Sequence, residues 1–136
     1  MAFKVFEKSS APLAKVPTVT IQKRGLISLN RSAHALIGSA DAVEFLFDAD
    51  RQVVGLRPVP EESPNAYPVR AQTSKNSSGP LLIAGTAFTK YHQIDTTEAR
   101  RWVPTVEDGI LCIDLNAESQ RVVSNRERAR LASEEH

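Results

Sequence analysis

The sequence predicts an α+β domain that consists mostly of antiparallel β-hairpins, with two short helices. Apolar and polar residues alternate in several short runs, which is the period of a half-buried strand. Residues that favour turns, such as glycine, aspartate and proline, separate these runs. The chain has 136 residues, of which 41% are hydrophobic, and this is enough for one domain with its own core.

The composition argues against several classes of protein. No apolar run approaches the length of a membrane span, and charged residues interrupt the first eight positions, unlike a secretory signal. Cys112 is the only cysteine and has apolar neighbours, so we expect it to pack as a small hydrophobic residue rather than bind a metal. We therefore expect a cytoplasmic protein that contacts no membrane and holds no metal or cofactor.

We divide the chain into three parts. Residues 1–17 contain two prolines and little periodicity, which predicts an extended N-terminal arm. A single β-rich domain is expected over 18–116. Residues 117–136 form a polar tail with a capping-box spacing at Ser124 and Glu127, which predicts a helix.

The first hairpin is expected near the start of the domain. Two alternating runs, Val19–Gln22 and Leu26–Leu29, flank Lys23-Arg24-Gly25, where the glycine would supply a positive φ. Asn30 is a typical N-cap for a helix over about 31–37, and Gly38 suits its C-terminal end.

A second hairpin is expected over 43–58, with its turn at Asp48-Ala49-Asp50. The loop rich in proline and acidic residues that follows separates two halves, 18–60 and 67–116. With an offset of 54 residues, "GLISLNRSA" parallels "GPLLIAGTA", which predicts an internal ββαββ repeat with a second helix over 87–94. Such a repeat would form a pseudo-dimer within one chain.

No constellation of residues indicates catalysis. His34 and His92 stand alone, and no carboxylate occupies a neighbouring helical position. A nucleophile elbow, a P-loop and a dinucleotide fingerprint are all missing from the sequence. We therefore expect no catalytic residues and no enzymatic activity.

The first hairpin contains the candidate binding site. Lys23 and Arg24 lie at the turn, and Asn30 and Arg31 begin the following helix, so we expect these four side chains to form a phosphate site that can also reach guanine edges. The alternative is an ordinary solvated turn. Secondary contacts are expected from Lys15, Arg100, Arg101 and Trp102. For Trp102, a place in the core is the favoured alternative.

The segment from residue 19 to residue 58 resembles the AbrB/SpoVT/MazE class of bacterial DNA-binding modules. The matching features are "VTIQKRGLISLN", "RSAHALIG" and "SADAVEFLFDADRQVVGLRPV". Asn30 stands where that family has a proline. The resemblance implies a homodimer of intertwined hairpins that holds DNA against basic strands and loops, with Lys23 and Arg24 in the positions of the family's basic residues.

The sequence thus predicts a nucleic-acid-binding protein, a small regulator of transcription that binds duplex DNA as a homodimer. Two alternatives stay open. One is a protein-interaction or structural module that uses its sheet edges and the 117–136 tail to hold a protein partner. The other is a sheet platform for single-stranded nucleic acid.

Overall fold

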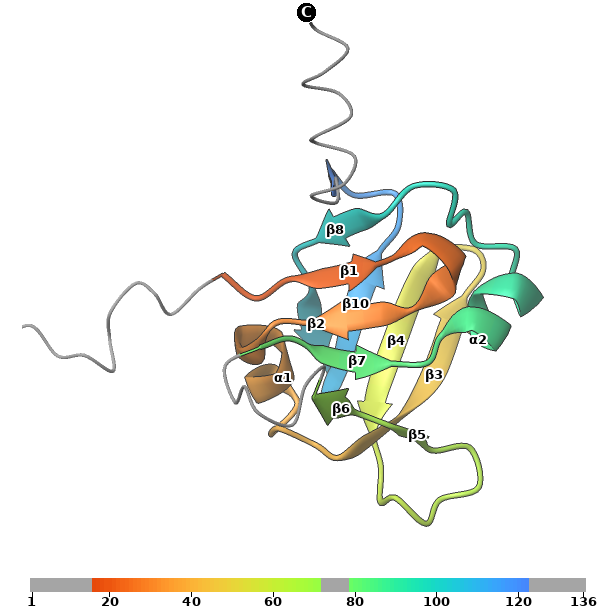
Figure 1. Cartoon of the computed structure of the whole chain (residues 1–136). Helices are drawn as coiled ribbons and strands as arrows, with labels where there is room; N and C mark the ends of the chain where they lie inside the picture. Colours follow the sequence, from red (N-terminus) through yellow and green to blue (C-terminus); the bar gives the residue numbers. More distant parts are fainter. Residues whose placement is uncertain (1–15, 72–78, 123–136) are drawn as a thin grey trace, which may run out of the picture.

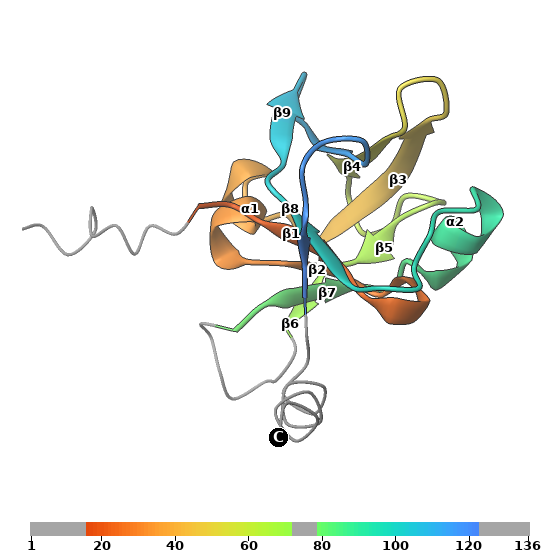
Figure 2. The same ribbon diagram turned by 90° about the horizontal axis from the view of Figure 1, so that it is seen from above.

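In the computed structural model, which describes residues 16–71 and 79–122, two antiparallel β-sheets pack face to face (Figures 1 and 2). Two short helices lie at opposite ends of this sandwich. The predicted α+β class with mostly antiparallel strands is confirmed. Most of the predicted arm over 1–17 and of the tail over 117–136 lies outside the described residues. Within those residues, no helix has both the length and the apolar character to cross a bilayer.

The first sheet has six strands in the order β11-β8-β1-β2-β7-β6. In chain order they are β1 (Val19–Ile21), β2 (Ile27–Leu29), β6 (Arg70–Ala71), β7 (Leu81–Ile83), β8 (Arg100–Trp102) and β11 (Gln120–Arg121). The second sheet has five strands in the order β5-β3-β4-β10-β9. They are β3 (Ala42–Asp48), β4 (Val53–Pro58), β5 (Tyr67–Pro68), β9 (Thr105–Glu107) and β10 (Ile110–Asp114). The remaining elements are the 3-10 turn η2 (Lys23–Gly25) and the helices α1 (Arg31–Leu36) and α2 (Thr86–Tyr91).

The core lies between the two sheets because alternate strand residues are apolar and face inward. On β1, Val19 and Ile21 are almost fully buried, while Thr20 between them belongs to the opposite face. On the second sheet, Leu56 of β4 and Leu111 of β10 face each other in register, and neither is exposed. The outer face of the six-stranded sheet is therefore available for polar side chains.

The locally encoded elements form as predicted. Asn30 caps α1 by accepting a hydrogen bond from the backbone nitrogen of Ala33 at 2.9 Å, and Gly25 and Gly38 both have positive φ. The second helix ends at Tyr91 rather than at residue 94, because the backbone of Gln93 turns into the left-handed region with φ 54°.

Strand pairing relates the two predicted halves of the chain. β2 pairs with β7 so that Ser28 faces Leu82, the two residues that the offset of 54 equates. β4 pairs with β10 in the other sheet, and α1 and α2 follow β2 and β7 along the chain. β8 lies where the predicted repeat places the counterpart of β3, but it pairs with β1 in one sheet, whereas β3 pairs with β4 in the other. The repeat stays a prediction, which these pairings support.

Candidate nucleic-acid interface

The cations Lys23 and Arg24 lie in the η2 turn that joins β1 to β2. The backbone nitrogen of Gln22 donates to the Leu26 oxygen at 2.7 Å, and that of Gly25 donates to the Gln22 oxygen at 2.9 Å. Arg24 has φ 73° and Gly25 has φ 93°, so two successive left-handed residues close the turn. The two cations therefore belong to a turn with a defined backbone.

The η2 turn packs against the start of α2 through two glycines. A Cβ atom on Gly25 would lie 2.9 Å from the Cα of Thr86, and one on Gly85 would lie 2.6 Å from the oxygen of Gly25. Neither position has room for a side chain. This close approach of backbone to backbone brings Lys23 and Arg24 to the same surface as α2.

A shallow hollow forms where the turn meets the helix. Three cations line it together with three threonines: Lys23, Arg24, Lys90, Thr86, Thr96 and Thr97. Within the part of the chain that the structure describes, no acidic residue is among those that line it. Ammonium, guanidinium and hydroxyl groups all donate hydrogen bonds, so the hollow suits a phosphate group. Sequence reasoning missed Lys90, since only the packing of α2 on η2 brings it here.

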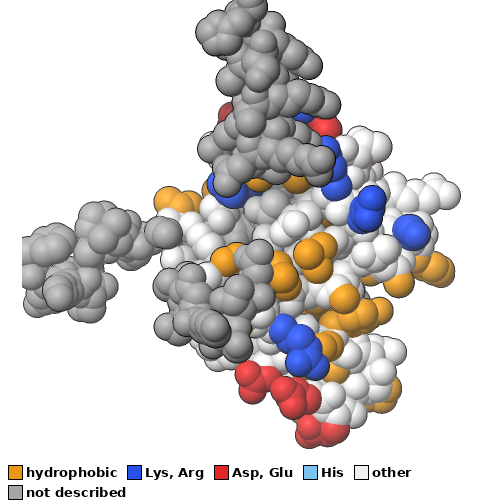
Figure 3. All heavy atoms as spheres, viewed as in Figure 1, with side chains coloured by type: hydrophobic (Ala, Val, Ile, Leu, Met, Phe, Trp, Pro, Cys, Tyr) orange, Lys and Arg blue, Asp and Glu red, His pale blue; other side chains and the backbone are white. Residues whose placement is uncertain are grey.

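A second hollow continues the basic surface across the outer face of the six-stranded sheet. Arg101 of β8 lies opposite Thr20 of β1, and its Nε donates to the threonine Oγ1 at 3.3 Å. Both residues line this hollow, and so does Lys23. Lys23 therefore joins the two hollows into one surface, the basic tract, which consists of Arg101, Lys23, Arg24 and Lys90. Figure 3 shows Lys and Arg side chains near the end of this face that carries η2 and α2.

Asn30 and Arg31, the other two residues predicted for the site, lie at the opposite end of β2. Asn30 Oδ1 accepts hydrogen bonds from the backbone nitrogens of Thr18 and Ala33, so its side chain holds the start of α1. Arg31 Nε donates to the oxygen of Gly79 at 3.0 Å. The structure therefore does not bring these two residues together with Lys23 and Arg24.

The residues predicted to make secondary contacts with nucleic acid do not form one group in the structure either. Lys15 lies outside the described residues. Arg101 belongs to the basic tract, whereas Arg100 forms an ion pair with Glu98 at 3.0 Å. Trp102 faces Val19 in the core and is only 6% exposed. The alternative interpretation of Trp102, as a core residue, is the one that agrees with its burial.

His34 and Cys112 are engaged in packing. His34 is buried, with its Nε2 2.7 Å from the oxygen of Ala40. Burial raises the pKa of the Cys112 thiol, and a hydrogen bond to Glu107 raises it further. No group of three or more His, Cys, Asp or Glu residues that suits a metal ion is found among the described residues.

No protein-family model matches the chain, and neither the curated proteins nor the solved structures contain a match. The geometry of the basic tract is therefore the best indication of function.

Proposed function

We propose that this protein binds nucleic acid through the basic tract. The observation that carries the proposal is the arrangement of four cations along two adjoining hollows, whose lining among the described residues includes no acidic side chain. Duplex DNA is the ligand predicted from the sequence, and a small DNA-binding regulator of transcription, similar to the AbrB/SpoVT/MazE class, is the role that this ligand implies.

The tract has the chemistry of a surface that binds phosphates. Each lysine or arginine that neutralises a phosphate releases condensed counterions, so affinity falls steeply as salt rises. Arg24 and Arg101 add guanidinium groups, which can bind two acceptors of a phosphate or a guanine at once. The backbone hydrogen bonds of η2 fix the positions of the Cα atoms from which the Lys23 and Arg24 side chains extend.

The test compares two double variants that lower the net charge equally. Lys23→Ala/Lys90→Ala removes two cations of the tract. Arg51→Ala/Arg57→Ala removes two cations from the other sheet, where each already pairs with a carboxylate: Arg57 with Glu44 at 2.6 Å and Arg51 with Glu107 at 3.5 Å. Fluorescence anisotropy with labelled duplex and single-stranded DNA is recorded over a salt series.

We expect wild type and the Arg51/Arg57 variant to bind with the same salt dependence. The Lys23/Lys90 variant should bind at least about tenfold more weakly, and the slope of log K against log salt should shrink by about two. Equal losses in both variants would mean that only net charge matters. Absence of binding by wild type at low salt would refute the proposal.

A protein-interaction module is the second candidate function. β9 is an edge strand of the five-stranded sheet, and Val106 on it is 44% exposed, next to Val103 at 61%. An exposed edge with apolar side chains can accept a strand from another chain. If DNA binding fails, this function would be favoured by a protein partner that the wild type retains and that the variant Val103→Asp/Val106→Asp does not retain.

A further inference from the structure

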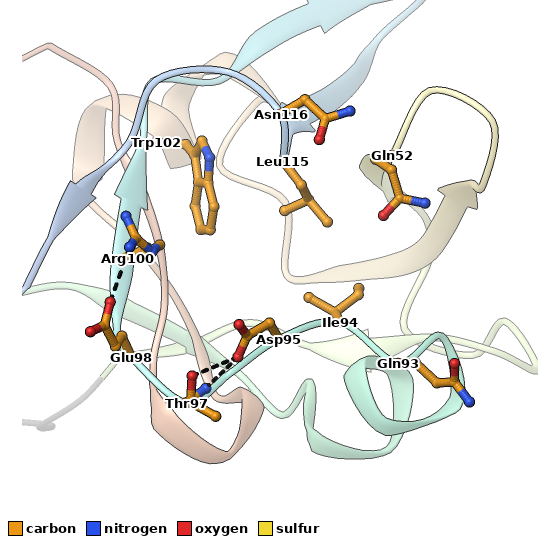
Figure 4. A pocket seen from close by; sticks show the side chains of 10 residues that line it. All are labelled: Gln52, Gln93, Ile94, Asp95, Thr97, Glu98, Arg100, Trp102, Leu115 and Asn116. Atoms are coloured by element: carbon orange, nitrogen blue, oxygen red, sulfur yellow. Dashed lines mark hydrogen bonds and ion pairs between the residues drawn. The ribbon is translucent and has the colours of Figure 1, made fainter.

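A separate hollow of about 360 Å³ opens at the end of the sandwich where residues 93–98 pass from α2 to β8. The residues that line it come from this segment, from β8, from the turn between β3 and β4 and from the chain after β10 (Figure 4). Its size lies within the range of small-ligand pockets, about 300–1,000 Å³.

The inner wall of this hollow contains an unsatisfied donor. Trp102 lines the hollow and is buried, with an exposed fraction of 6%. Within the described part of the chain, its indole nitrogen Nε1 has no hydrogen-bond partner. The nitrogen itself exposes less than 1 Å². Buried polar groups are nearly always paired, so a small turn of the indole toward the hollow would give this donor an acceptor on a ligand. Ile94 and Leu115 add apolar surface beside the indole (Figure 4).

Three amide side chains surround this apolar wall. Gln52, Gln93 and Asn116 line the hollow and are all exposed. Each amide offers a donor and an acceptor. A planar ring with donors and acceptors on its edge and an apolar face matches this combination, and a nucleobase is such a ring.

Charges beside the hollow disfavour an anion within it. Asp95 accepts hydrogen bonds from the nitrogen and the Oγ1 of Thr97 at 2.9 and 2.7 Å, and these bonds hold the pKa of its carboxyl below its ordinary value. Asp95 therefore stays ionised. Glu98 is also a lining residue, and its charge is already matched by Arg100 at 3.0 Å. A phosphate belongs outside this hollow.

The hollow adjoins the basic tract. Thr97 lines the Trp102 hollow and also the hollow formed by Lys23, Arg24 and Lys90. A ligand with a neutral ring and a neighbouring phosphate would therefore place the ring beside Trp102 and the phosphate on the tract.

We propose that the Trp102 hollow receives one unpaired nucleobase of a nucleic-acid strand whose phosphates lie on the basic tract. This inference rests on the proposed function and narrows the ligand to a nucleic acid with an unpaired base. A paired base inside a duplex cannot enter the hollow without leaving its stack. With the indole turned toward the hollow, an acceptor on the base edge would bond to Trp102 Nε1, and the amides of Gln93 and Asn116 would contact its other polar atoms.

The test uses the full chain and its own fluorescence. Trp102 is the only tryptophan, so its emission reports on this hollow alone. The protein is titrated with a labelled 12-nucleotide DNA strand and with an abasic strand of the same length. Anisotropy measures binding, and tryptophan emission measures occupancy. Free nucleoside monophosphate is titrated separately.

We expect the strand with bases to quench Trp102 and to bind about tenfold more tightly than the abasic strand, which should bind without quenching. Asn116→Ala should reduce the affinity for the strand with bases by several-fold and leave abasic binding unchanged. Asn65→Ala, another exposed asparagine that lies in the loop between β4 and β5, is the matched control and should change neither.

Equal affinity for both strands without a change in emission would overturn the base site while leaving the tract intact. Failure of both strands to bind at low salt would also overturn the base site, and failure of duplex DNA to bind as well would overturn the proposed function. Quenching by free nucleoside monophosphate at the concentrations at which the strand quenches would assign the hollow to a free nucleotide and also overturn the inference.

Discussion

At the scale of single residues, Gly25 meets two requirements that no other amino acid meets together. Its φ of 93° lies in the region that glycine favours, and a Cβ would contact the backbone of α2 at 2.9 Å. We expect Gly25→Ala to lower the free energy of unfolding by about 2–4 kcal/mol, measured by urea denaturation. Because the turn would move off α2, affinity for DNA should fall as well.

The substitution Gly38→Ala separates the effect of backbone strain from the effect of contact with α2. Gly38 also has a positive φ, 66°, but a Cβ there would have no atom within 4 Å. Its replacement tests backbone strain alone, for which we expect a loss of about 1 kcal/mol and unchanged DNA binding. Equal losses at the two glycines would show that contact with α2 adds nothing to the role of Gly25.

At the scale of elements, the sequence predicts the features that depend on residues close together in the chain. The β1–β2 hairpin, the Asn30 cap and the positive φ at Gly25 each depend on residues within a few positions, and all are present. The basic tract depends instead on long-range pairing: β8 beside β1 brings Arg101 to the outer face, and α2 on η2 brings Lys90 to Lys23. No local signal in the sequence encodes these contacts.

Because the sequence shows only distance along the chain, it groups Asn30 and Arg31 with the residues of the turn. The sequence places them only a few residues after Lys23 and Arg24, but the extended strand β2 carries the chain away by about 10 Å over three residues. The Trp102 hollow was missed for a related reason. Apart from Arg100 of β8, its polar lining residues belong to three connecting segments without periodicity, which meet only in the folded chain.

The segment between α2 and β8 depends on Asp95. Hydrogen bonds from Thr97 lower the pKa of this carboxyl, so its ionised form stabilises the fold above the pKa of the unfolded chain. This contribution is lost as pH falls through the lower folded-state pKa. We expect Asp95→Asn to lower the melting temperature slightly near pH 7 and to have a shrinking effect below about pH 4.

Thermal unfolding followed by circular dichroism at several pH values measures this difference. Asp50→Asn, in the turn between β3 and β4, is a control for the loss of one exposed carboxylate. A destabilisation by Asp95→Asn that is the same at pH 3 and at pH 7 would mean that the charge of Asp95 has no part in holding the segment.

At the scale of the whole molecule, the strand pairings that join the two predicted halves lie within one chain. β2 pairs with β7 in one sheet and β4 pairs with β10 in the other, so the predicted halves complete both sheets together. A homodimer of intertwined hairpins, which the resemblance to the AbrB/SpoVT/MazE class implies, would supply such pairings between two chains. The alternative predicted from the repeat, a pseudo-dimer within one chain, needs no partner to close its core.

We therefore expect the free protein to sediment as a single chain of 14.9 kDa over a wide range of concentrations. The physical reason is that the residues between the sheets, such as Leu56 and Leu111, are already fully buried without a second copy. Sedimentation equilibrium from micromolar to millimolar protein measures the mass. A mass of twice this value that persists on dilution would favour the homodimer, and would mean that another surface, such as the β9 edge, joins the copies.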